Sequence, residues 1–196
     1  MFLFRKNSIL FYFYGFFRNF LPDNFHKQEA QMDRITLSHG FGPFWRPDSR
    51  LLILGSFPSS ASREAGFYYG HPRNRFWQVL SRLSGEEAPV TMEEKRSFLA
   101  RKGIALYDVI ASCSVVGSSD ASIRDAVPTD LSPILEGSRV GDRIFANGKL
   151  AQSCFDRFQA PLLGLSCICL PSTSPANASY SLDKLCACWL EKIGPL

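Results

Sequence analysis

The feature that most constrains this chain is a short apolar run, Leu51–Leu54, which stops at Gly55 and opens into a small, polar segment at 56–60. Consecutive apolar residues that end at a glycine are typical of a strand buried on both faces. A helical pattern follows at about 73–83, where apolar residues recur at core spacing. A strand that leads through a polar loop into a helix places that loop at the carboxyl edge of an α/β sheet, where ligands bind.

The same alternation continues along the chain. We predict further strands at 104–110, 143–146 and 165–170, and further helices at 91–102, 130–135, 148–158 and 180–193. Thr91 and Glu94 have the spacing of a capping box, and Pro72 suits the first turn of its helix. Strands that alternate with helices predict a mainly parallel sheet that is covered on both faces.

Four segments leave the carboxyl ends of the predicted strands, and we expect them to meet at one edge of the sheet. They are 55–72, 111–129, 147–149 and 171–179. Residues 111–129 are predicted to be a long, serine-rich loop, and loops of that length inside compact domains are often functional. Asp120 is the carboxylate in this loop that we expect to face the pocket.

Composition predicts one globular domain over residues 32–196, since 45% of the chain's 196 residues are hydrophobic. Residues 1–31 are crowded with Phe and Tyr and lack the small-residue cleavage site of a signal peptide. We interpret them as a non-native or poorly ordered extension, with a surface-lying or membrane-associating segment as the alternative.

No apolar run reaches the roughly 18 residues of a membrane span, so no membrane partner is expected. The net charge of +4 is compatible with a phosphate-bearing partner.

The six cysteines are predicted to be core residues and not metal ligands. Cys167 and Cys169 lie in an apolar strand pattern, and Cys186 and Cys188 in an apolar helix pattern. Neither pair has the spacing typical of zinc sites. Reduced cysteines favour a cytoplasmic location, associated with the nucleoid if the source is a bacterium.

Four blocks in a fixed order carry a resemblance to a known family. They are GSFPS from Gly55, YYGHPRNRFW from Tyr68, FANGKLA from Phe145 and LPSTSPANA from Leu170. Together they resemble the uracil-DNA glycosylase superfamily, and within it the hypoxanthine (deoxyinosine)-DNA glycosylase branch. The resemblance implies a three-layer α/β/α sandwich with a four-stranded, mainly parallel sheet.

The same resemblance implies an enzyme of base excision repair that hydrolyses the N-glycosidic bond of a deaminated base, above all hypoxanthine. It further implies double-stranded DNA containing a damaged base as the partner, a monomer, and no metal or cofactor. Two alternatives stay open: a mismatch-type uracil-DNA glycosylase, and a non-catalytic module that binds damaged DNA. A serine hydrolase is disfavoured, because the segment from Gly55 to Ser59 does not provide the G-x-S-x-G elbow.

The resemblance also implies roles for single residues. Many relatives carry an Asp or Asn where this chain has Phe57, so the catalytic role passes to Asn74, which either holds a water through its amide oxygen or bonds the base. Tyr69 is the candidate stacking platform, with Phe57 and Tyr68 as rivals. We expect the base pocket to contain Gly55, Ser56, Phe57, Pro58, Tyr69, His71 and Ser112. We expect DNA contacts from Arg73, Lys149, Ser172, Thr173, Ser174, Ala176 and Asn177, and Arg75 is a further candidate for a phosphate.

Overall fold

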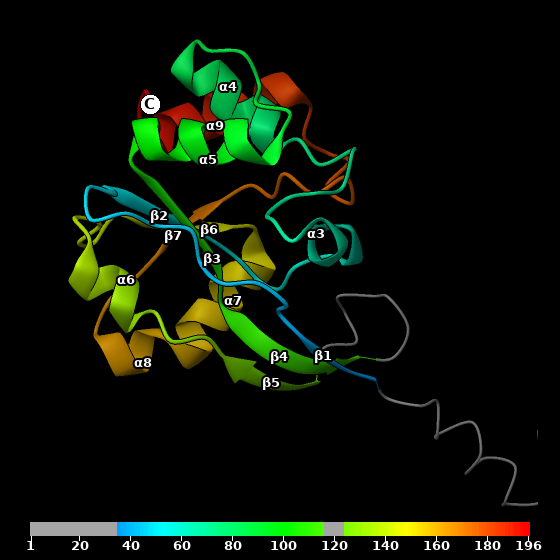
Figure 1. Cartoon of the computed structure of the whole chain (residues 1–196), viewed down its shortest axis with the longest axis vertical. Coiled ribbons are helices and arrows are strands. Elements are labelled where there is room, and N and C mark those ends of the chain that lie inside the picture. Colours follow the sequence, from blue (N-terminus) through cyan, green and yellow to red (C-terminus); the bar gives the residue numbers. More distant parts are fainter. Residues whose placement is uncertain (1–34, 116–123) are drawn as a thin grey trace, which may run out of the picture.

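A four-stranded parallel sheet forms the centre of the molecule (Figure 1). A computed structural model of the chain describes residues 35–115 and 124–196, so the predictions for residues 1–31 and for Asp120 lie outside the described residues. The strands are β2 (Leu51–Gly55), β3 (Ile104–Asp108), β6 (Ile144–Asn147) and β7 (Ile168–Leu170). They lie in the order β3-β2-β6-β7, which confirms the predicted sheet.

Helices cover both faces of this sheet, as Figure 1 shows. One face carries α4 (Phe76–Ser84), α5 (Met92–Lys102) and α9 (Leu182–Ile193). The other carries α6 (Ser132–Gly137), α7 (Lys149–Phe158) and α8 (Ala160–Leu163). The predicted three-layer α/β/α sandwich is therefore confirmed.

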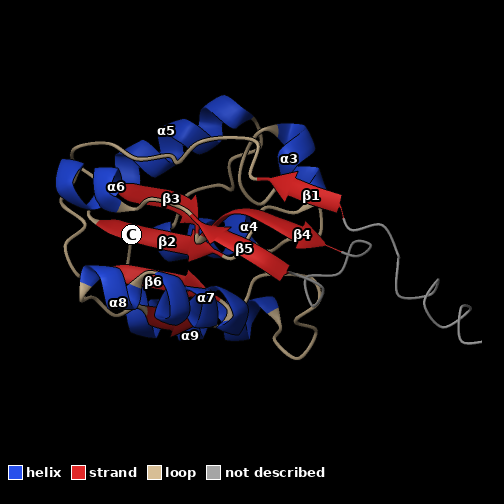
Figure 2. Cartoon of the chain, turned by 90° about the horizontal axis from the view of Figure 1, so that it is seen from below, coloured by secondary structure: helices blue, strands red, loops and turns tan. Residues whose placement is uncertain are grey.

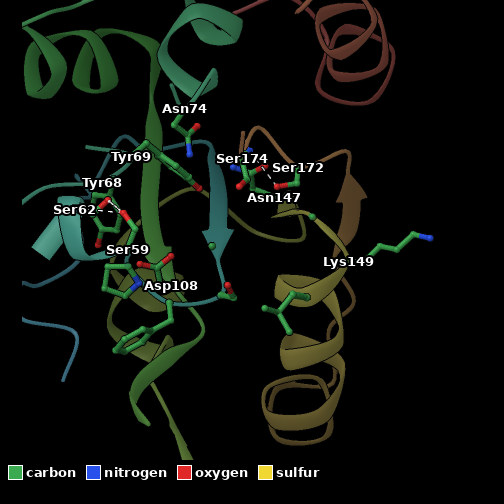
Figure 3. A pocket seen from close by; sticks show the side chains of 16 residues that line it. Ser59, Ser62, Tyr68, Tyr69, Asn74, Asp108, Asn147, Lys149, Ser172 and Ser174 are labelled. Atoms are coloured by element: carbon green, nitrogen blue, oxygen red, sulfur yellow. Dashed lines mark hydrogen bonds between the residues drawn. The ribbon is translucent and has the colours of Figure 1, made fainter. Parts of the chain in front are cut away.

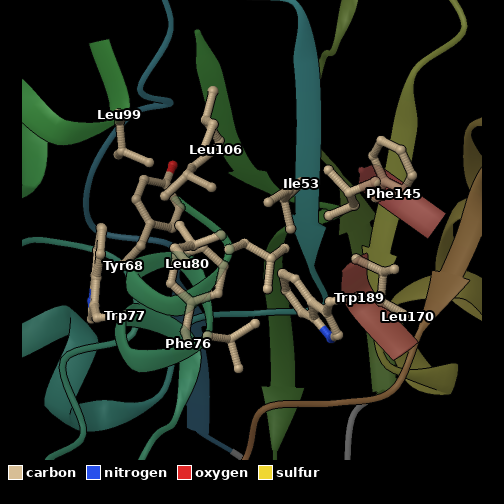
Figure 4. Close-up of a cluster of buried hydrophobic side chains, with 14 of the residues drawn as sticks. Ile53, Tyr68, Phe76, Trp77, Leu80, Leu99, Leu106, Phe145, Leu170 and Trp189 are labelled. Atoms are coloured by element: carbon tan, nitrogen blue, oxygen red, sulfur yellow. The ribbon is translucent and has the colours of Figure 1, made fainter. Parts of the chain in front are cut away.

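The central strand β2 shows why the sheet needs both layers. Leu51 and Ile53 pack into one apolar cluster, which α4, α5 and α9 complete (Figure 4). Leu52 and Leu54 pack into a second cluster on the opposite face. All four side chains are buried, because successive residues of a strand point to opposite faces. The carboxyl end of β2 is thus held rigidly between two cores.

The prediction of a long loop over 111–129 is wrong for the residues that the structure describes there. β4 (Ile110–Val115) pairs with β1 (Ile35–Ser38) and β5 (Arg124–Pro128) in a second, antiparallel sheet. Figure 2 shows this sheet beyond the arrowheads of β2 and β3. The predicted strand at 104–110 is interrupted after Asp108, and the chain continues into β4. β1 and β5 are mostly exposed and β4 contains two serines, so these strands carry little apolar signal, which explains the error.

Smaller boundary errors concern the loop after β2 and the last strand. A short helix, α3 (Ser60–Ala65), lies within the predicted loop 55–72, and Ser59 caps it by accepting from the backbone N–H of Ser62. α4 begins at Phe76 and not near residue 73, so Pro72 precedes the helix. β7 is shorter than predicted. The capping box of Thr91 and Glu94 at α5 is confirmed. None of the described helices is both long and apolar enough to cross a membrane.

Candidate active site

A pocket with a volume of about 200 Å³ opens at the carboxyl ends of β2, β3 and β6, beside the loop that follows β7 (Figure 3). It is smaller than pockets for drug-sized ligands, which hold roughly 300–1,000 Å³. It is lined by Gly55, Ser56, Phe57, Pro58, Ser59, Ser62, Tyr68, Tyr69, Asn74, Asp108, Asn147, Gly148, Lys149, Leu150, Ser172 and Ser174. The predicted meeting of loops at this edge of the sheet therefore produces a site for a small, partly polar group.

Asp108 approaches β2 at a point where only glycine fits. Gly55 and Asp108 are register partners in the parallel pair β2–β3. A Cβ atom on Gly55 would lie 2.0 Å from Asp108 Oδ1 and 3.6 Å from the Tyr69 hydroxyl. The missing side chain of Gly55 is thus what brings a carboxylate and a phenol to the same wall of the pocket.

His39 holds the other oxygen of that carboxylate. Its Nε2 lies 2.9 Å from Asp108 Oδ2, and the two residues are only 5% and 4% exposed. The imidazole is surrounded by aromatic rings, with Phe41 at 4.5 Å and Tyr107 at 5.2 Å between ring centroids. A buried carboxylate is costly unless it is paired, and His39 supplies the pairing. We refer to His39 and Asp108 as the carboxylate wall.

Neither residue of the carboxylate wall was predicted from the sequence to line the pocket. Asp108 lies within the strand predicted at 104–110, and His39 lies in none of the four segments expected at the edge of the sheet. A signal was present: Asp108 is the polar residue that closes the buried strand β3, at the edge where ligands bind. His39 carried no comparable signal, because its pairing depends on contacts between distant parts of the chain.

The opposite wall is a network of two amides and one hydroxyl, which we call the amide wall (Asn74, Asn147, Thr173). The Thr173 hydroxyl donates to Asn74 Oδ1 over 2.9 Å and accepts from Asn147 Nδ2 over 2.9 Å. The Thr173 backbone N–H donates to Asn147 Oδ1 over 3.0 Å. Each hydrogen bond fixes the orientation of an amide, so the network joins the start of α4, the end of β6 and the loop after β7.

The free group of Asn74 is its amide nitrogen. Asn74 Oδ1 accepts from the backbone N–H of Phe76 over 3.0 Å as well as from Thr173. A backbone N–H can only donate, so the oxygen must face it, and the orientation of the amide is settled. Among the described residues Nδ2 has no partner, and Figure 3 shows it turned toward Tyr69. Asn74 therefore offers a hydrogen-bond donor to the pocket.

Arg75 clamps the loop that carries Thr173. Its guanidinium donates to the carbonyls of Ser174 over 2.7 Å and Asn177 over 3.0 Å, and also to those of Thr173 and Tyr180. The expectation that Arg75 contacts a phosphate is not supported, because these donors already have partners. Arg75 instead stabilises the conformation of the loop after β7 by bonding its backbone carbonyls.

Tyr69 combines a strained backbone with an unpaired hydroxyl. Its φ of 53° lies in the left-handed region, and its ring stacks on Phe76 with 3.7 Å between centroids. The hydroxyl is buried and has no hydrogen-bond partner among the described residues. Burial raises the pKa of the phenol strongly, nearby Asp108 raises it further, and the neighbouring side chain of Asn147 lowers it. Tyr69 thus presents a neutral hydroxyl beside Asp108.

The predicted base-pocket residues divide into two groups. Gly55, Ser56, Phe57, Pro58 and Tyr69 line the pocket, as Asn74 does. His71 and Ser112 do not line it. The Nδ1 atom of His71 accepts from the backbone N–H of Arg73, which keeps the ring in its own turn, and Ser112 lies in β4 opposite Ser38. Tyr68 also lines the pocket, but its side chain is buried and its hydroxyl donates to the Gly42 carbonyl, which favours Tyr69 over it as the stacking platform.

The predicted DNA-binding residues are also separated by the structure. Lys149, Ser172 and Ser174 line the pocket, and Arg73 and Ala176 are exposed. Thr173 is 0% exposed, and its hydroxyl is used within the amide wall, so the expected phosphate contact through it is wrong. Asn177 braces its loop by donating to the Ser172 carbonyl over 2.9 Å.

Among the described residues, no group of three or more His, Cys, Asp or Glu side chains could hold a metal ion. Lys149 is the one cationic residue in the pocket lining given above, and Asp108 is the one acidic residue. The pocket therefore offers one carboxylate, oriented amides and several hydroxyls, whereas the Lys149 ammonium is directed away from them, as Figure 3 shows.

Comparisons with known proteins agree on one family. Residues 43–192 match the family described as the uracil DNA glycosylase superfamily. A protein of Methanosarcina acetivorans named hypoxanthine DNA glycosylase is 33% identical over 156 residues, which cover 76% of this chain and 93% of that protein. A protein of the same name from Methanosarcina barkeri is 33% identical over 104 residues, which cover 50% of this chain and 66% of that protein. A solution NMR structure of a candidate uracil DNA glycosylase from Methanosarcina acetivorans has a TM-score of 0.65 at 31% identity, covering 77% of this chain and 92% of that one.

Proposed function

The chain belongs to the uracil DNA glycosylase superfamily, and on that premise we propose that it excises hypoxanthine from double-stranded DNA by hydrolysing the N-glycosidic bond. Two relatives from Methanosarcina bear the name hypoxanthine DNA glycosylase, which supports hypoxanthine over uracil as the main substrate. The pocket of about 200 Å³ suits a single base that has been turned out of the duplex. The observation that carries the proposal is the oriented donor of Asn74 in this pocket.

The reaction breaks the bond between C1′ of the sugar and a ring nitrogen of the base. The sugar becomes cationic in the transition state, and the electron pair leaves with the base. A water molecule adds its oxygen to C1′, and the departing base takes up a proton. Donors that are already oriented toward the developing anion lower the barrier of such a step, because they need no reorganisation.

Asn74 is well suited to stabilise the departing base. Phe76 and Thr173 hold its oxygen, so Nδ2 is directed into the pocket as a fixed donor. Of the two roles considered from the sequence, a hydrogen bond to the base is therefore favoured over a water held through the amide oxygen. The missing acid at Phe57 is compatible with this chemistry, since a strongly stabilised leaving group needs only a weakly activated water.

The surface next to the pocket is suited to the DNA backbone. A neighbouring hollow shares Lys149 and Ser172 with the pocket and also contains Asn177 and Lys192. Lysines and short hydroxyl side chains are common partners of phosphate oxygens. We infer that the strand carrying the damaged base runs over this hollow, with the loop around Ala176 entering the duplex.

The test is an excision assay with the full chain. Duplex oligonucleotides carry one deoxyinosine, deoxyuridine or deoxyxanthosine, and abasic sites are detected by alkaline cleavage. We expect deoxyinosine to react fastest. Asn74→Asp keeps an oxygen for Phe76 and Thr173 but replaces the donor with a negative charge, so the single-turnover rate should fall at least about 100-fold. Affinity for the DNA should change much less.

The matched control is Gln78→Glu, which makes the same amide-to-carboxylate change at an exposed position of α4. It should react like the unmodified protein. An Asn74→Asp variant with an unchanged rate would remove Asn74 from the mechanism. Binding of all three duplexes without any abasic product would show that the protein is a damaged-DNA binder and not an enzyme.

A further inference from the structure

The proposed mechanism uses neither Asp108 Oδ1 nor the Tyr69 hydroxyl, although both belong to the pocket lining. Asp108 Oδ2 is held by His39 at 2.9 Å, whereas Oδ1 faces the position that a Gly55 side chain would occupy. The Tyr69 hydroxyl is near the same position and has no partner among the described residues. A buried hydrogen-bonding group without a partner is unusual in a native protein, and its occurrence in a pocket suggests that a ligand completes it.

The two groups have opposite hydrogen-bonding character. A carboxylate oxygen accepts hydrogen bonds, so Asp108 Oδ1 is the acceptor of the pair. The Tyr69 phenol is kept protonated by its burial and by the neighbouring carboxylate, so it can donate. Asp108 and Tyr69 thus present an acceptor and a donor side by side in the pocket, where Asp108 is only 4% exposed.

Deamination of adenine to hypoxanthine, or of cytosine to uracil, creates the complementary pair on the base. Hypoxanthine, xanthine and uracil each carry a ring N–H next to a carbonyl oxygen, which together form a lactam edge. Adenine carries the reverse pattern, with an unprotonated ring nitrogen next to an amino group. A carboxylate that faces the unprotonated ring nitrogen of adenine would be repelled and left unpaired, which is a strong basis for rejection.

We propose that Asp108 and Tyr69 read the lactam edge of a deaminated base, with Asp108 Oδ1 accepting from the ring N–H and Tyr69 Oη donating to the carbonyl oxygen. The inference rests on the proposed function, because it concerns the base that the same pocket receives. His39 is a positioning residue, since it fixes the carboxylate and does not itself line the pocket. Because Gly55 has no side chain, Asp108 Oδ1 and the Tyr69 hydroxyl can both reach the base past it.

The experiment compares two substrates that differ only at this edge. Duplexes carry either deoxyinosine or 2′-deoxynebularine, whose purine has an unprotonated N1 and no carbonyl oxygen. Single-turnover rates are measured for the full chain and for Asp108→Asn, Tyr69→Phe and the control Tyr107→Phe. With His39 Nε2 as the donor to this side chain, we expect the amide oxygen of Asp108→Asn to face His39 and its NH₂ to face the base, which favours nebularine.

The measured quantity is the ratio of the deoxyinosine rate to the nebularine rate, in which effects common to both substrates cancel. We expect this ratio to fall about 100-fold in Asp108→Asn and about tenfold in Tyr69→Phe. Tyr107→Phe, which makes the same chemical change next to Asp108 but outside the pocket lining, should leave it unchanged. Equal losses on both substrates in Asp108→Asn would overturn the inference, because Asp108 would then act on a step common to both.

Folding is checked by thermal melting of each variant. Should Asp108→Asn fail to fold, Tyr69→Phe decides, since it removes one oxygen that has no partner among the described residues. A lower ratio in that variant supports the inference, and an unchanged ratio overturns it. An unmodified protein that is inactive on every deaminated base would instead refute the proposed function itself, so the two failures are distinguishable.

Discussion

The two walls of the pocket are built on different physical principles. The carboxylate wall depends on close packing, because Asp108 Oδ1 occupies the space of a side chain that Gly55 lacks. The amide wall depends on hydrogen bonds, which run from Asn74 through Thr173 to Asn147. The first is sensitive to added volume, and the second is sensitive to the loss of a donor or an acceptor.

The difference also separates binding from chemistry. In our proposals the carboxylate wall selects the base, and the amide wall stabilises it as it leaves. Close packing suits selection, since a rigid acceptor that cannot move away rejects the wrong edge of a base. Oriented donors suit the transition state, since they are in place before charge develops.

The largest effect should come from adding a side chain at Gly55, next to the carboxylate wall. In Gly55→Ala the new Cβ would lie 2.0 Å from Asp108 Oδ1, between two cores that hold β2 in place. We expect a loss of about 2–3 kcal/mol in the free energy of unfolding, typical of overpacking in a rigid core. Excision of hypoxanthine should fall at least about 100-fold, because the carboxylate must leave its position.

Gly42→Ala is the matched control for this change. A Cβ on Gly42 would meet nothing within 4 Å, and its backbone does not require glycine. Urea unfolding and single-turnover excision measure the two effects. A Gly55→Ala variant as stable and active as Gly42→Ala would show that the carboxylate wall is not held by packing.

The next largest effect should come from releasing the loop that supports the amide wall. Arg75→Ala removes the guanidinium that bonds the carbonyls of Thr173, Ser174, Asn177 and Tyr180. We expect about 1.5–3 kcal/mol of destabilisation, the usual range for hydrogen bonds that involve a charged group. Activity should fall more than stability explains, because Thr173 then loses its fixed position.

Arg139→Ala, at an exposed arginine beyond α6, controls for the loss of one surface charge. Arg75→Lys tests the geometry, because a single ammonium cannot reach the same set of carbonyls. Rates near the unmodified value in Arg75→Ala would show that the loop keeps its shape without the clamp.

Sequence reasoning reached one wall of the pocket more readily than the other. The strand that ends at Gly55 was predicted from apolar periodicity, which acts over short distances, whereas the role of Asn74 was predicted from the family resemblance. The pair of His39 and Asp108 was missed, because residues 69 positions apart meet only once the two sheets are formed. Thr173 was predicted to face DNA, since a small polar loop gives no sign of which hydroxyl turns inward.

The second sheet was missed for a related reason. β4 joins β1 and β5 through backbone hydrogen bonds, and its serines alternate with a buried Cys113. Pairing of strands depends on partners elsewhere in the chain, whereas a helix reveals itself within a few residues. The fold class was therefore predictable from the parallel strands, and the elements beyond the edge of the sheet were not.

The smallest of these effects should come from removing one hydroxyl of the amide wall. Thr173→Val keeps the shape of the side chain but removes the donor to Asn74 Oδ1 and the acceptor for Asn147 Nδ2. We expect about 1–2 kcal/mol of destabilisation, because a buried amide donor loses its partner. Asn74 keeps its bond from Phe76, so the single-turnover rate should fall only about tenfold. Thr173→Ser keeps the hydroxyl and should therefore react at the rate of the unmodified protein. A Ser variant as slow as the Val variant would show that packing of the methyl group, and not the hydrogen-bond network, orients the amide of Asn74.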